Sequence, residues 1–549
     1  MVVIRRQNAA ENYEDIKQPT TQNPNGLISK VLPESQEFSG ARKWTFRQIS
    51  NAAKHAVRSS FFAFQCLVTA VALLCIFAFL SPLLVLHNAL RFVEKKLVYL
   101  RTGANAMTGQ DALWLQDSEE NRMIVNSVMV LEGANDGTVD KIRAVLNRCV
   151  AMKNEAGELT YPRLTKHIRR GNFQYFLEET ENFDIAQQVF EYDGERPKSR
   201  EELEEVMSRF ASKGLRLDIP PWVFIVIRKG YADGEAVVLF RMHHSLADGI
   251  SLSYFLAHVL PDHQVPYRPL AKFSNANLMV MKIWSLLVGP KIILKKLFSP
   301  ADRSILHGPQ ITGVKRLTWS EPIDLQVIKR IKNQTGTTVN DVIMACLSMS
   351  LHDYFKSQGI TDPPDVMASV PVDVRFQEAA EMKFENNFAI VSLKLPVSEK
   401  DIMQQLYSTK ANMDEVKHSG EAFAMATAAN FTVEFIPAFI TNIWNKRIAN
   451  LHSMVLSNVP GPTTPLTIGG LKTKELFFWP PQRDLVGIGI GVYSYAGKVI
   501  IGVQGDVNCL CKPQLIVKGF EAKIAEMERC IFNSTSQTKV DSGVETVSH

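Results

Sequence analysis

The feature that most constrains this chain is the stretch of residues 61–86, about 26 residues long, which contains no charged side chain. A helix of about 20 apolar residues is long enough to cross the hydrocarbon core of a bilayer. The stretch therefore predicts a transmembrane helix over residues 59–88. Ser81-Pro82 leaves a membrane hairpin as the alternative, because proline interrupts the hydrogen bonds of a helix. A signal peptide is disfavoured, since the stretch starts late, is long and lacks a small-residue cleavage site.

Basic residues flank the apolar stretch on both sides, including Arg58 before it and Arg91 after it. The positive-inside rule compares the two sides, so it gives no orientation here. Residues 1–58 are polar without a periodic apolar pattern and predict a mobile N-terminal tail. Residues 533–549 are also polar and predict a mobile C-terminal tail.

The size and composition of the chain limit the remaining possibilities. Its 549 residues exceed what one hydrophobic core usually serves, which predicts two domains or one domain in two halves. The net charge is only +5, and no basic stripe interleaved with aromatic residues indicates a nucleic-acid partner. The seven cysteines have neither disulfide nor zinc-site spacing, which favours a reducing, cytosol-facing location for the folded part.

One loop near the middle of the chain carries candidate chemistry. Residues 235–240 read as a strand and residues 250–260 as an amphipathic helix, and between them lies His243-His244-Ser245-Leu246-Ala247-Asp248-Gly249. A loop histidine is a candidate general base near neutral pH. Two ordinary surface histidines are the alternative. A metal site is disfavoured, because adjacent strand residues point to opposite faces and no third ligand lies at a usual spacing.

Four short blocks resemble known acyltransferases. The segment from His243 to Gly249 resembles the HHxxxDG signature of the CoA-dependent acyltransferase superfamily. Residues 107–114 resemble the opening block of the wax ester synthase/diacylglycerol acyltransferase family. Asn340-Asp341 and residues 457–462 are similar to two later blocks of that family, in the same order. The resemblance runs from about Met107 to about Cys530, which is most of the chain.

The resemblance implies an α/β (α+β) fold of two chloramphenicol-acetyltransferase-like halves joined by a crossover, in addition to the N-terminal transmembrane helix. We place the N-terminal half, which contains the HHxxxDG motif, at residues 105–270, and the C-terminal half at residues 313–532. Residues 271–312 form an amphipathic crossover linker between them. Within this linker, residues 278–298 mix apolar side chains with lysines, which favours either a segment lying on a membrane or a linker packed on the protein.

The same resemblance implies roles for residues of the motif. His244 is the general base that takes a proton from an alcohol, with His243 as its supporting neighbour. Asp248 and Gly249 shape the loop, through an ion pair and a tight turn. Ser457 is the candidate donor to the oxyanion that forms when a thioester carbonyl is attacked. A strand end closed by a Pro-Gly turn is the alternative for that block.

Further residues are candidates with structural alternatives. Arg375 resembles a superfamily arginine that pairs with the motif aspartate, so we predict an ion pair between Asp248 and Arg375; a surface arginine is the alternative. Asn340, Asp341 and Asn458 are substrate-tunnel candidates, and helix capping is the alternative for Asn340-Asp341. Residues 384–388 stand where the family often has Phe-Gly-Asn, with Glu385 in place of the glycine, and we assign them no role.

The reaction implied by the resemblance needs no bound cofactor and no metal. Its co-substrate is a long-chain acyl-CoA, and its acceptor is a fatty alcohol or diacylglycerol, which gives a wax ester or triacylglycerol. We expect contact with membrane lipid at the endoplasmic reticulum or a lipid droplet, with the catalytic part facing the cytosol. The alternatives are an enzyme for another lipophilic alcohol, such as a sterol or retinol, and a non-catalytic acyl-CoA-binding or lipid-binding membrane protein. The intact motif argues against the non-catalytic alternative.

Overall fold

The computed structural model describes residues 46–263, 265, 275–307, 310–375 and 382–541 of the chain. Most of the predicted N-terminal tail and the last residues of the predicted C-terminal tail lie outside this part. Helix α13 (Pro513–Asp541) continues through residues 533–541, so the C-terminal tail that we predicted to begin at residue 533 is helical there. A helix can extend through polar residues once its preceding turns are packed, which composition alone does not reveal.

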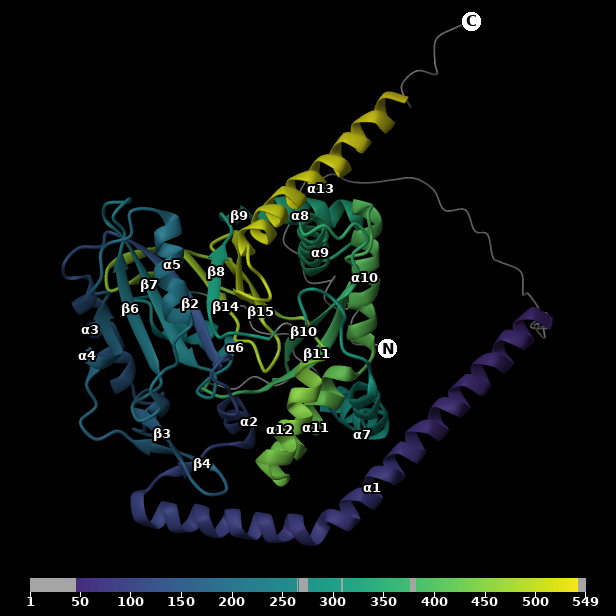
Figure 1. Cartoon of the computed structure of the whole chain (residues 1–549), viewed down its shortest axis with the longest axis horizontal. Helices are drawn as coiled ribbons and strands as arrows, with labels where there is room; N and C mark the ends of the chain where they lie inside the picture. The colour runs from purple at the N-terminus through teal and green to yellow at the C-terminus, as the bar shows by residue number, and fades with distance from the viewer. Residues whose placement is uncertain (1–45, 264, 266–274, 308–309, 376–381, 542–549) are drawn as a thin grey trace, which may run out of the picture.

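The N-terminal helix α1 (Phe46–Thr102) is continuous over 57 residues and contains Pro82. This corrects two expectations, because the chain forms no hairpin at Ser81-Pro82 and residues 46–58 are helical rather than irregular. By length and composition, Ser60–Thr102 is the one described segment that could cross a membrane. At about 1.5 Å per residue the helix is roughly 85 Å long, well beyond the thickness of a bilayer. Figure 1 shows α1 along the lower edge of the molecule, with its N-terminal part leaving the body.

The motif lies on the first large sheet, whose strand order is β13-β14-β2-β7-β6-β5. Its central strands are almost wholly buried, as their near-continuous runs of Val, Ile, Leu and Phe require. Its strands and associated helices are β2 (Ile124–Glu132), β5 (Val189–Glu191), β6 (Trp222–Arg228), β7 (Glu235–His243), α3 (Thr138–Ala151), α4 (Ile185–Gln188) and α5 (Arg200–Ala211). This part lies on the left in Figure 1.

The second large sheet has the order β11-β10-β12-β15-β16-β8, with β9 also paired to β16. Helices α8, α9, α10 and α13 pack on it or on one another around a second apolar core. The bounds are β8 (Lys315–Trp319), β9 (Ile323–Asp324), α8 (Leu325–Thr335), α9 (Val339–Ser357), β10 (Val366–Asp373), β11 (Phe388–Leu395), α10 (Ile402–His418), β12 (Met454–Pro460), β15 (Ile488–Tyr495) and β16 (Lys498–Asp506).

Two strands from the C-terminal half belong to the sheet of the N-terminal half. β14 (Leu471–Trp479) pairs antiparallel with β2, and β13 (Thr467–Ile468) pairs with β14. The C-terminal half that we predicted at residues 313–532 therefore contributes two strands to the first sheet. An unpaired edge of β2 would expose a row of backbone hydrogen-bonding groups, and β14 satisfies them. Figure 1 shows β14 beside β2, so the two halves are tied together by backbone hydrogen bonds.

The remaining elements surround the junction of the halves. A small sheet of order β1-β4-β3 lies near α1. The helices α2, α6, α11 and α12 lie at the junction of the two halves. The bounds are β1 (Asn105–Ala106), α2 (Gly109–Ala112), η1 (Leu113–Leu115), η2 (Pro162–Leu164), β3 (Lys166–Arg170), β4 (Tyr175–Glu179), α6 (Gly249–Tyr254), the π-helical turn η3 (Phe255–Val259), α11 (Glu421–Phe435) and α12 (Ala438–Ala449).

The predicted crossover linker contains a helix, α7 (Asn275–Phe298), which packs against both α1 and α11. Residues 271–274 and 308–309 of the linker lie outside the described residues. The outer side of α7 is apolar, since the side chains of Ile283, Trp284 and Leu286 are 49%, 50% and 64% exposed. The helix therefore packs on the protein with one face and leaves an apolar face uncovered.

Candidate active site

The HHxxxDG motif turns the chain from strand β7 into helix α6. β7 ends at His243, and Asp248 caps α6 by accepting a hydrogen bond from the backbone N–H of Ser251 at 2.9 Å. A Cβ atom placed on Gly249 would lie 3.4 Å from Cγ2 of Val459 in β12. The glycine therefore allows the start of α6 to pack closely against the second half of the protein.

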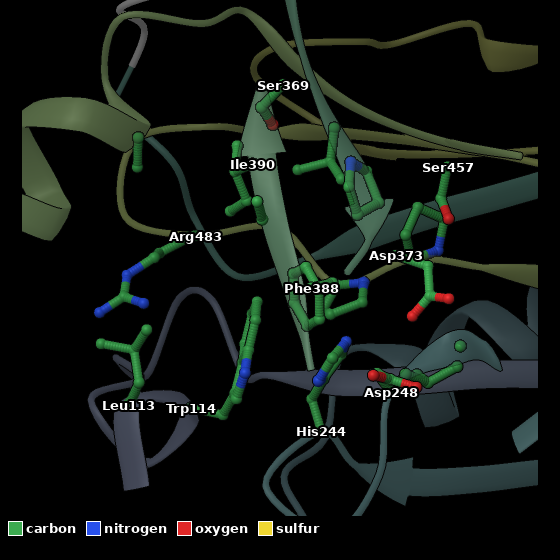
Figure 2. Close-up of a pocket in the computed structure, with 18 of the residues that line it drawn as sticks. Leu113, Trp114, His244, Asp248, Ser369, Asp373, Phe388, Ile390, Ser457 and Arg483 are labelled. Atoms are coloured by element: carbon green, nitrogen blue, oxygen red, sulfur yellow. The ribbon is translucent and has the colours of Figure 1, made fainter. Parts of the chain in front are cut away.

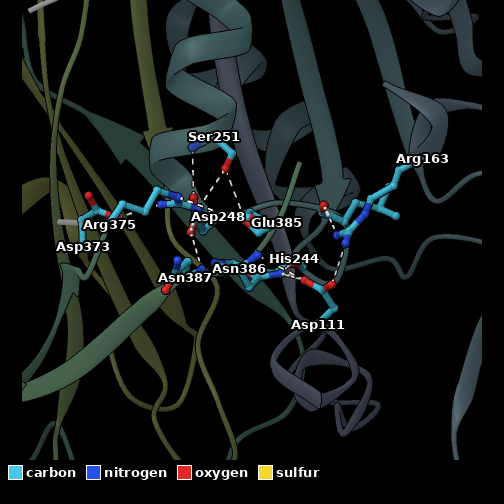
Figure 3. Close-up of polar contacts among 11 residues, drawn as sticks. Asp111, Arg163, His244, Asp248, Ser251, Asp373, Arg375, Glu385, Asn386 and Asn387 are labelled. Carbon is cyan, nitrogen blue, oxygen red and sulfur yellow. Dashed lines mark hydrogen bonds and ion pairs between the residues drawn. The ribbon is translucent and has the colours of Figure 1, made fainter. Parts of the chain in front are cut away.

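The predicted ion pair between Asp248 and Arg375 is present. The guanidinium of Arg375 lies 2.7 Å from Asp248 and 2.7 Å from Asp373, and all three side chains are largely buried. Burial by itself would lower the pKa of Arg375, but the two carboxylates outweigh it and raise that pKa. Because Arg375 follows β10 and Asp248 follows β7, the pair fixes the motif loop to the opposite half (Figure 3).

The imidazole of His244 is oriented by Asn386, to which the sequence assigned no role. His244 Nδ1 lies 2.8 Å from Asn386 Oδ1. The Asn386 amide nitrogen donates to the carbonyl of His244 at 2.8 Å and to Asp111 at 2.9 Å, and both of these groups can only accept. The amide orientation is thereby fixed, and its oxygen accepts a hydrogen bond from Nδ1–H. Nε2 is then the ring nitrogen that carries the lone pair.

Asp111 extends this arrangement into a chain of polar contacts. Arg163 donates to Asp111 at 2.7 Å and to the carbonyl of Leu246, inside the motif loop, at 2.8 Å. The backbone N–H of Asn386 also donates to Asp111 at 3.1 Å. Figure 3 shows the series from Arg163 through Asp111 and Asn386 to His244. A buried carboxylate with these partners holds both the amide and the loop that carries the histidine.

The ring of His244 is enclosed by aromatic side chains. Trp114 stacks on it with ring centroids 4.0 Å apart, and the Phe388 ring centroid lies 5.6 Å away. Burial lowers the pKa of His244 to about 4, although the Asp248 carboxylate acts in the opposite direction. The imidazole is therefore neutral at pH 7 and able to accept a proton. Figure 2 shows Trp114 and Asp248 on opposite sides of it.

His243 points away from this arrangement, as expected of a neighbour on an extended strand. Its Nδ1 lies 2.8 Å from the hydroxyl of Ser245, and its Nε2 lies 3.7 Å from the carboxylate of Asp117. Its side chain is buried. The side chain of His243 therefore contacts Ser245 of the motif loop and Asp117, and these contacts are separate from those of His244.

A cavity of about 330 Å³ lies between the two halves, with His244 in its wall. Most of its lining is apolar, and Figure 2 shows Leu113, Trp114, Phe388 and Ile390 around it. Among the predicted residues, the cavity brings together the following: His244, Asp248, Gly249, Ser457 and Asn458. Such a mainly apolar space with a few polar groups is typical of a site for an organic substrate.

Two predicted tunnel residues do not line this cavity. Asp341 completes a capping box with Thr338 at the start of α9, which is the structural alternative for this residue. Asn340 accepts a hydrogen bond from the side chain of Asn458 at 2.8 Å. Asn340 therefore lies one hydrogen bond behind a residue of the cavity wall.

Two family profiles match the chain. The one described as the wax ester synthase/diacylglycerol acyltransferase catalytic domain matches residues 107–282, and the one described as the WS/DGAT C-terminal domain matches residues 384–528. Together they cover more than half of the chain. The chain belongs to the wax ester synthase/diacylglycerol acyltransferase family. It is an acyltransferase of this type, and the expected family is confirmed.

Individual relatives agree with this assignment. A Mycobacterium tuberculosis protein that carries the name of a diacylglycerol O-acyltransferase is 22% identical over 390 residues, which are 64% of this chain and 76% of that protein. The wax ester synthase/diacylglycerol acyltransferase of Marinobacter aquaeolei VT8 has a TM-score of 0.57 at 22% identity, covering 78% of this chain and all of that one. A condensation domain of the calcium-dependent antibiotic synthetase has a TM-score of 0.51 at 15% identity, covering 78% and 96%. These likenesses confirm the predicted fold class.

The structure of this chain adds residues that the sequence did not single out. Asp111 and Trp114 lie in the opening block that carries the resemblance, and Asn386 lies in the segment where Glu385 departs from the family pattern. Arg483 lies in the cavity wall, where burial lowers its pKa to about 10, and it donates to the Gln116 amide oxygen at 3.0 Å. No carboxylate of the described residues lies within 4.0 Å of its guanidinium. No periodicity or local spacing marks Arg483 in the sequence.

Proposed function

We propose that this protein is a membrane-bound O-acyltransferase that transfers a long-chain acyl group from acyl-CoA to a fatty alcohol or diacylglycerol. The observation that carries the proposal is the state of His244 in an apolar cavity. Its Nδ1–H is held by Asn386 at 2.8 Å, and its ring is neutral. An imidazole with one nitrogen fixed as a donor presents the other as a base.

In the proposed reaction, Nε2 of His244 takes the proton of the acceptor hydroxyl while its oxygen attacks the thioester carbonyl. The tetrahedral intermediate collapses, the bond from carbon to sulfur breaks, and the CoA thiolate receives the proton from the imidazolium. The Asp248 carboxylate favours the transient imidazolium, and Asn386 keeps the ring in place. Acid–base help of this kind contributes about 10² to 10⁴ in rate. Positioning both substrates in one cavity contributes more.

Ser457 remains our candidate for the oxyanion donor. It lies on β12, is 6% exposed and shares the cavity wall with His244. A hydroxyl at this place supports the proposal, because it has a proton to donate to the developing negative charge. Loss of one oxyanion donor typically lowers kcat by about 10² to 10³, which is the size of effect expected for Ser457→Ala.

The membrane location is supported by the packing of α1. Phe77, within its uncharged stretch, contacts Phe431 of α11 with ring centroids 5.3 Å apart. Phe439 and Ile443 of the neighbouring helix α12 are 69% and 66% exposed, and α7 is exposed on its apolar face. A large exposed apolar surface beside a membrane helix fits contact with lipid. We place the protein at the endoplasmic reticulum or a lipid droplet, with the site facing cytosolic acyl-CoA.

The test is ester formation by membranes that contain the wild type, His244→Ala or His418→Ala, supplied with labelled palmitoyl-CoA and either hexadecanol or diolein. His418 is an exposed histidine on α10 and serves as the matched control. We expect labelled ester from the wild type and the control, and none from His244→Ala. Equal product from all three proteins would remove His244 from the reaction.

A further inference from the structure

A second cavity, of about 110 Å³, lies between the C-terminal part of α1, the β3–β4 hairpin and the junction of α11 with α12. We call this space the small cavity, and we call the cavity of about 330 Å³ that contains His244 the reaction cavity. Leu113 of η1 lines both of them. A hydrogen bond also joins the two walls, because Gln116 of the small cavity accepts from Arg483 of the reaction cavity at 3.0 Å. The two spaces are thus neighbours, and Leu113 belongs to the walls of both.

The small cavity differs from the reaction cavity in its chemistry. Its wall contains the basic residues Arg91 and Arg170 and the amides of Gln116 and Gln174. Arg91 donates to the backbone carbonyl of Glu434, and Gln174 donates to the carbonyl of Arg91 at 2.9 Å, so the wall is ordered. Arg170 is exposed at the edge of the cavity. The amide nitrogen of Gln116 already donates to Ala438 and Thr441. The N–H groups of Arg170, and those of Arg91 and Gln174 that the contacts above leave over, offer donors to oxygen atoms of a ligand.

The small cavity lies where the uncharged part of α1 ends. No Asp, Glu, Lys or Arg occurs between Arg58 and Arg91, and Arg91 is in the cavity wall. Glu94 fastens this end of α1 to the β3–β4 turn, because its carboxylate accepts from the backbone N–H of Phe173 at 3.1 Å. With the uncharged stretch in a bilayer, basic residues at its end lie at the level of the lipid headgroups.

From these observations we propose that the small cavity is the membrane-side entrance for the acceptor, and that it takes diacylglycerol. The ester carbonyls of a diacylglycerol accept hydrogen bonds from the basic and amide side chains, and its free hydroxyl then passes Leu113 towards His244. A simple long-chain alcohol has no ester oxygen to be held there. This proposal rests on the proposed function and names its preferred acceptor. A site built to bind a substrate oxygen discriminates against an analogue that lacks it.

The experiment compares Arg170→Leu and Leu113→Trp with the wild type in the full-length protein, reconstituted in phosphatidylcholine vesicles that contain diolein or hexadecanol. The matched controls are Arg529→Leu and Leu515→Trp, exposed positions on α13 away from both cavities. Arg170→Leu should lower kcat/KM for diolein about tenfold and leave kcat/KM for hexadecanol within about twofold. Leu113→Trp should lower kcat/KM for diolein at least tenfold.

An equal loss with both acceptors in Arg170→Leu, or no loss with diolein, would overturn the entrance. Because Arg170 is exposed, this variant tests the proposal even where Leu113→Trp fails to fold. A wild type that esterifies hexadecanol but not diolein overturns the acceptor preference and leaves the proposed function standing. A wild type that esterifies neither acceptor removes the proposed function, and the entrance falls with it.

Discussion

Two buried imidazoles line the reaction cavity, and they differ in what their nitrogens can do. Burial lowers the pKa of both His244 and His452 to about 4. His452 Nδ1 lies 3.2 Å from the carbonyl of Ala449, and its Nε2 lies 2.7 Å from the hydroxyl of Ser392, so both nitrogens are occupied. Among the described residues, no hydrogen bond occupies Nε2 of His244. Burial and neutrality alone therefore do not identify a base.

The charges beside the two rings also differ in sign. After burial, the largest influence on the pKa of His244 is the Asp248 carboxylate, which raises it, whereas for His452 it is the Lys296 ammonium, which lowers it further. Each charge is itself paired in the protein, Asp248 with Arg375 at 2.7 Å and Lys296 with Glu421 at 2.6 Å. A transient imidazolium is favoured at His244 and opposed at His452.

Replacing each histidine in turn tests whether His244 alone acts as the base. His244→Gln should lower kcat for ester formation by about 10² to 10⁴, because it removes the base, while His452→Gln should lower it by at most about tenfold through altered packing. Initial rates with labelled palmitoyl-CoA measure both variants. A larger loss in His452→Gln than in His244→Gln would reverse the assignment.

The ion pair between Asp248 and Arg375 can be broken by replacing the arginine. Arg375→Ala leaves the buried carboxylates of Asp248 and Asp373 without their partner and should destabilise the protein by about 3–5 kcal/mol. Denaturant unfolding of the detergent-solubilised protein measures this change. Arg216→Ala is the matched control, because the Arg216–Asp218 pair is exposed to solvent and contributes little to stability. Equal stability of the two variants would contradict a structural role for Arg375.

The hydrogen bond from His244 to Asn386 allows the effect of ring orientation on kcat to be measured. Asn386→Leu removes the acceptor of Nδ1–H, so the imidazole loses its fixed tautomer, and kcat should fall about tenfold to a hundredfold, the cost of one lost buried hydrogen bond. Initial rates measured over a range of palmitoyl-CoA concentrations separate kcat from KM. A change confined to KM would show that Asn386 affects binding and not the base.

The smallest effect concerns stability below neutral pH. Both histidines have folded-state pKa values lowered from 6.5 to about 4, so between these values the unfolded chain binds more protons than the native protein. Their contribution to stability is complete above pH 6.5 and is lost as the pH falls towards 4, at no more than about 1.4 kcal/mol per pH unit for each ring. Unfolding midpoints measured from pH 7 to pH 5 should decline less steeply in His452→Gln than in the wild type.

The sequence predicts well what is coded locally. The strand, motif loop and helix around His244 follow each other in the chain, so apolar pattern and motif locate them together. The pairing of Asp248 with Arg375 came from the resemblance and is confirmed by the 2.7 Å contact. The family and fold class, which depend on four separate blocks, are confirmed as well.

What the sequence misses depends on contacts between distant residues. Asn386 is 142 residues from His244, and Asp111 is 275 residues from Asn386, so no spacing rule connects the three. A polar residue that hydrogen-bonds to a distant histidine is not part of any periodic apolar pattern. The departure from the family pattern at Glu385 also gave no reason to single out the neighbouring Asn386. The exchange of β14 into the first sheet is likewise a property of topology, because a strand pattern does not name its partner.

The exchanged strand has a consequence for synthesis. β2 ends at Glu132, and its partner β14 begins only at Leu471, so a ribosome adding about 5–20 residues per second needs roughly 20–70 s to supply it. During that interval one edge of β2 has no strand to pair with and is open to other chains. Premature termination before Leu471 would leave this edge open permanently, and the product would be a substrate for quality control.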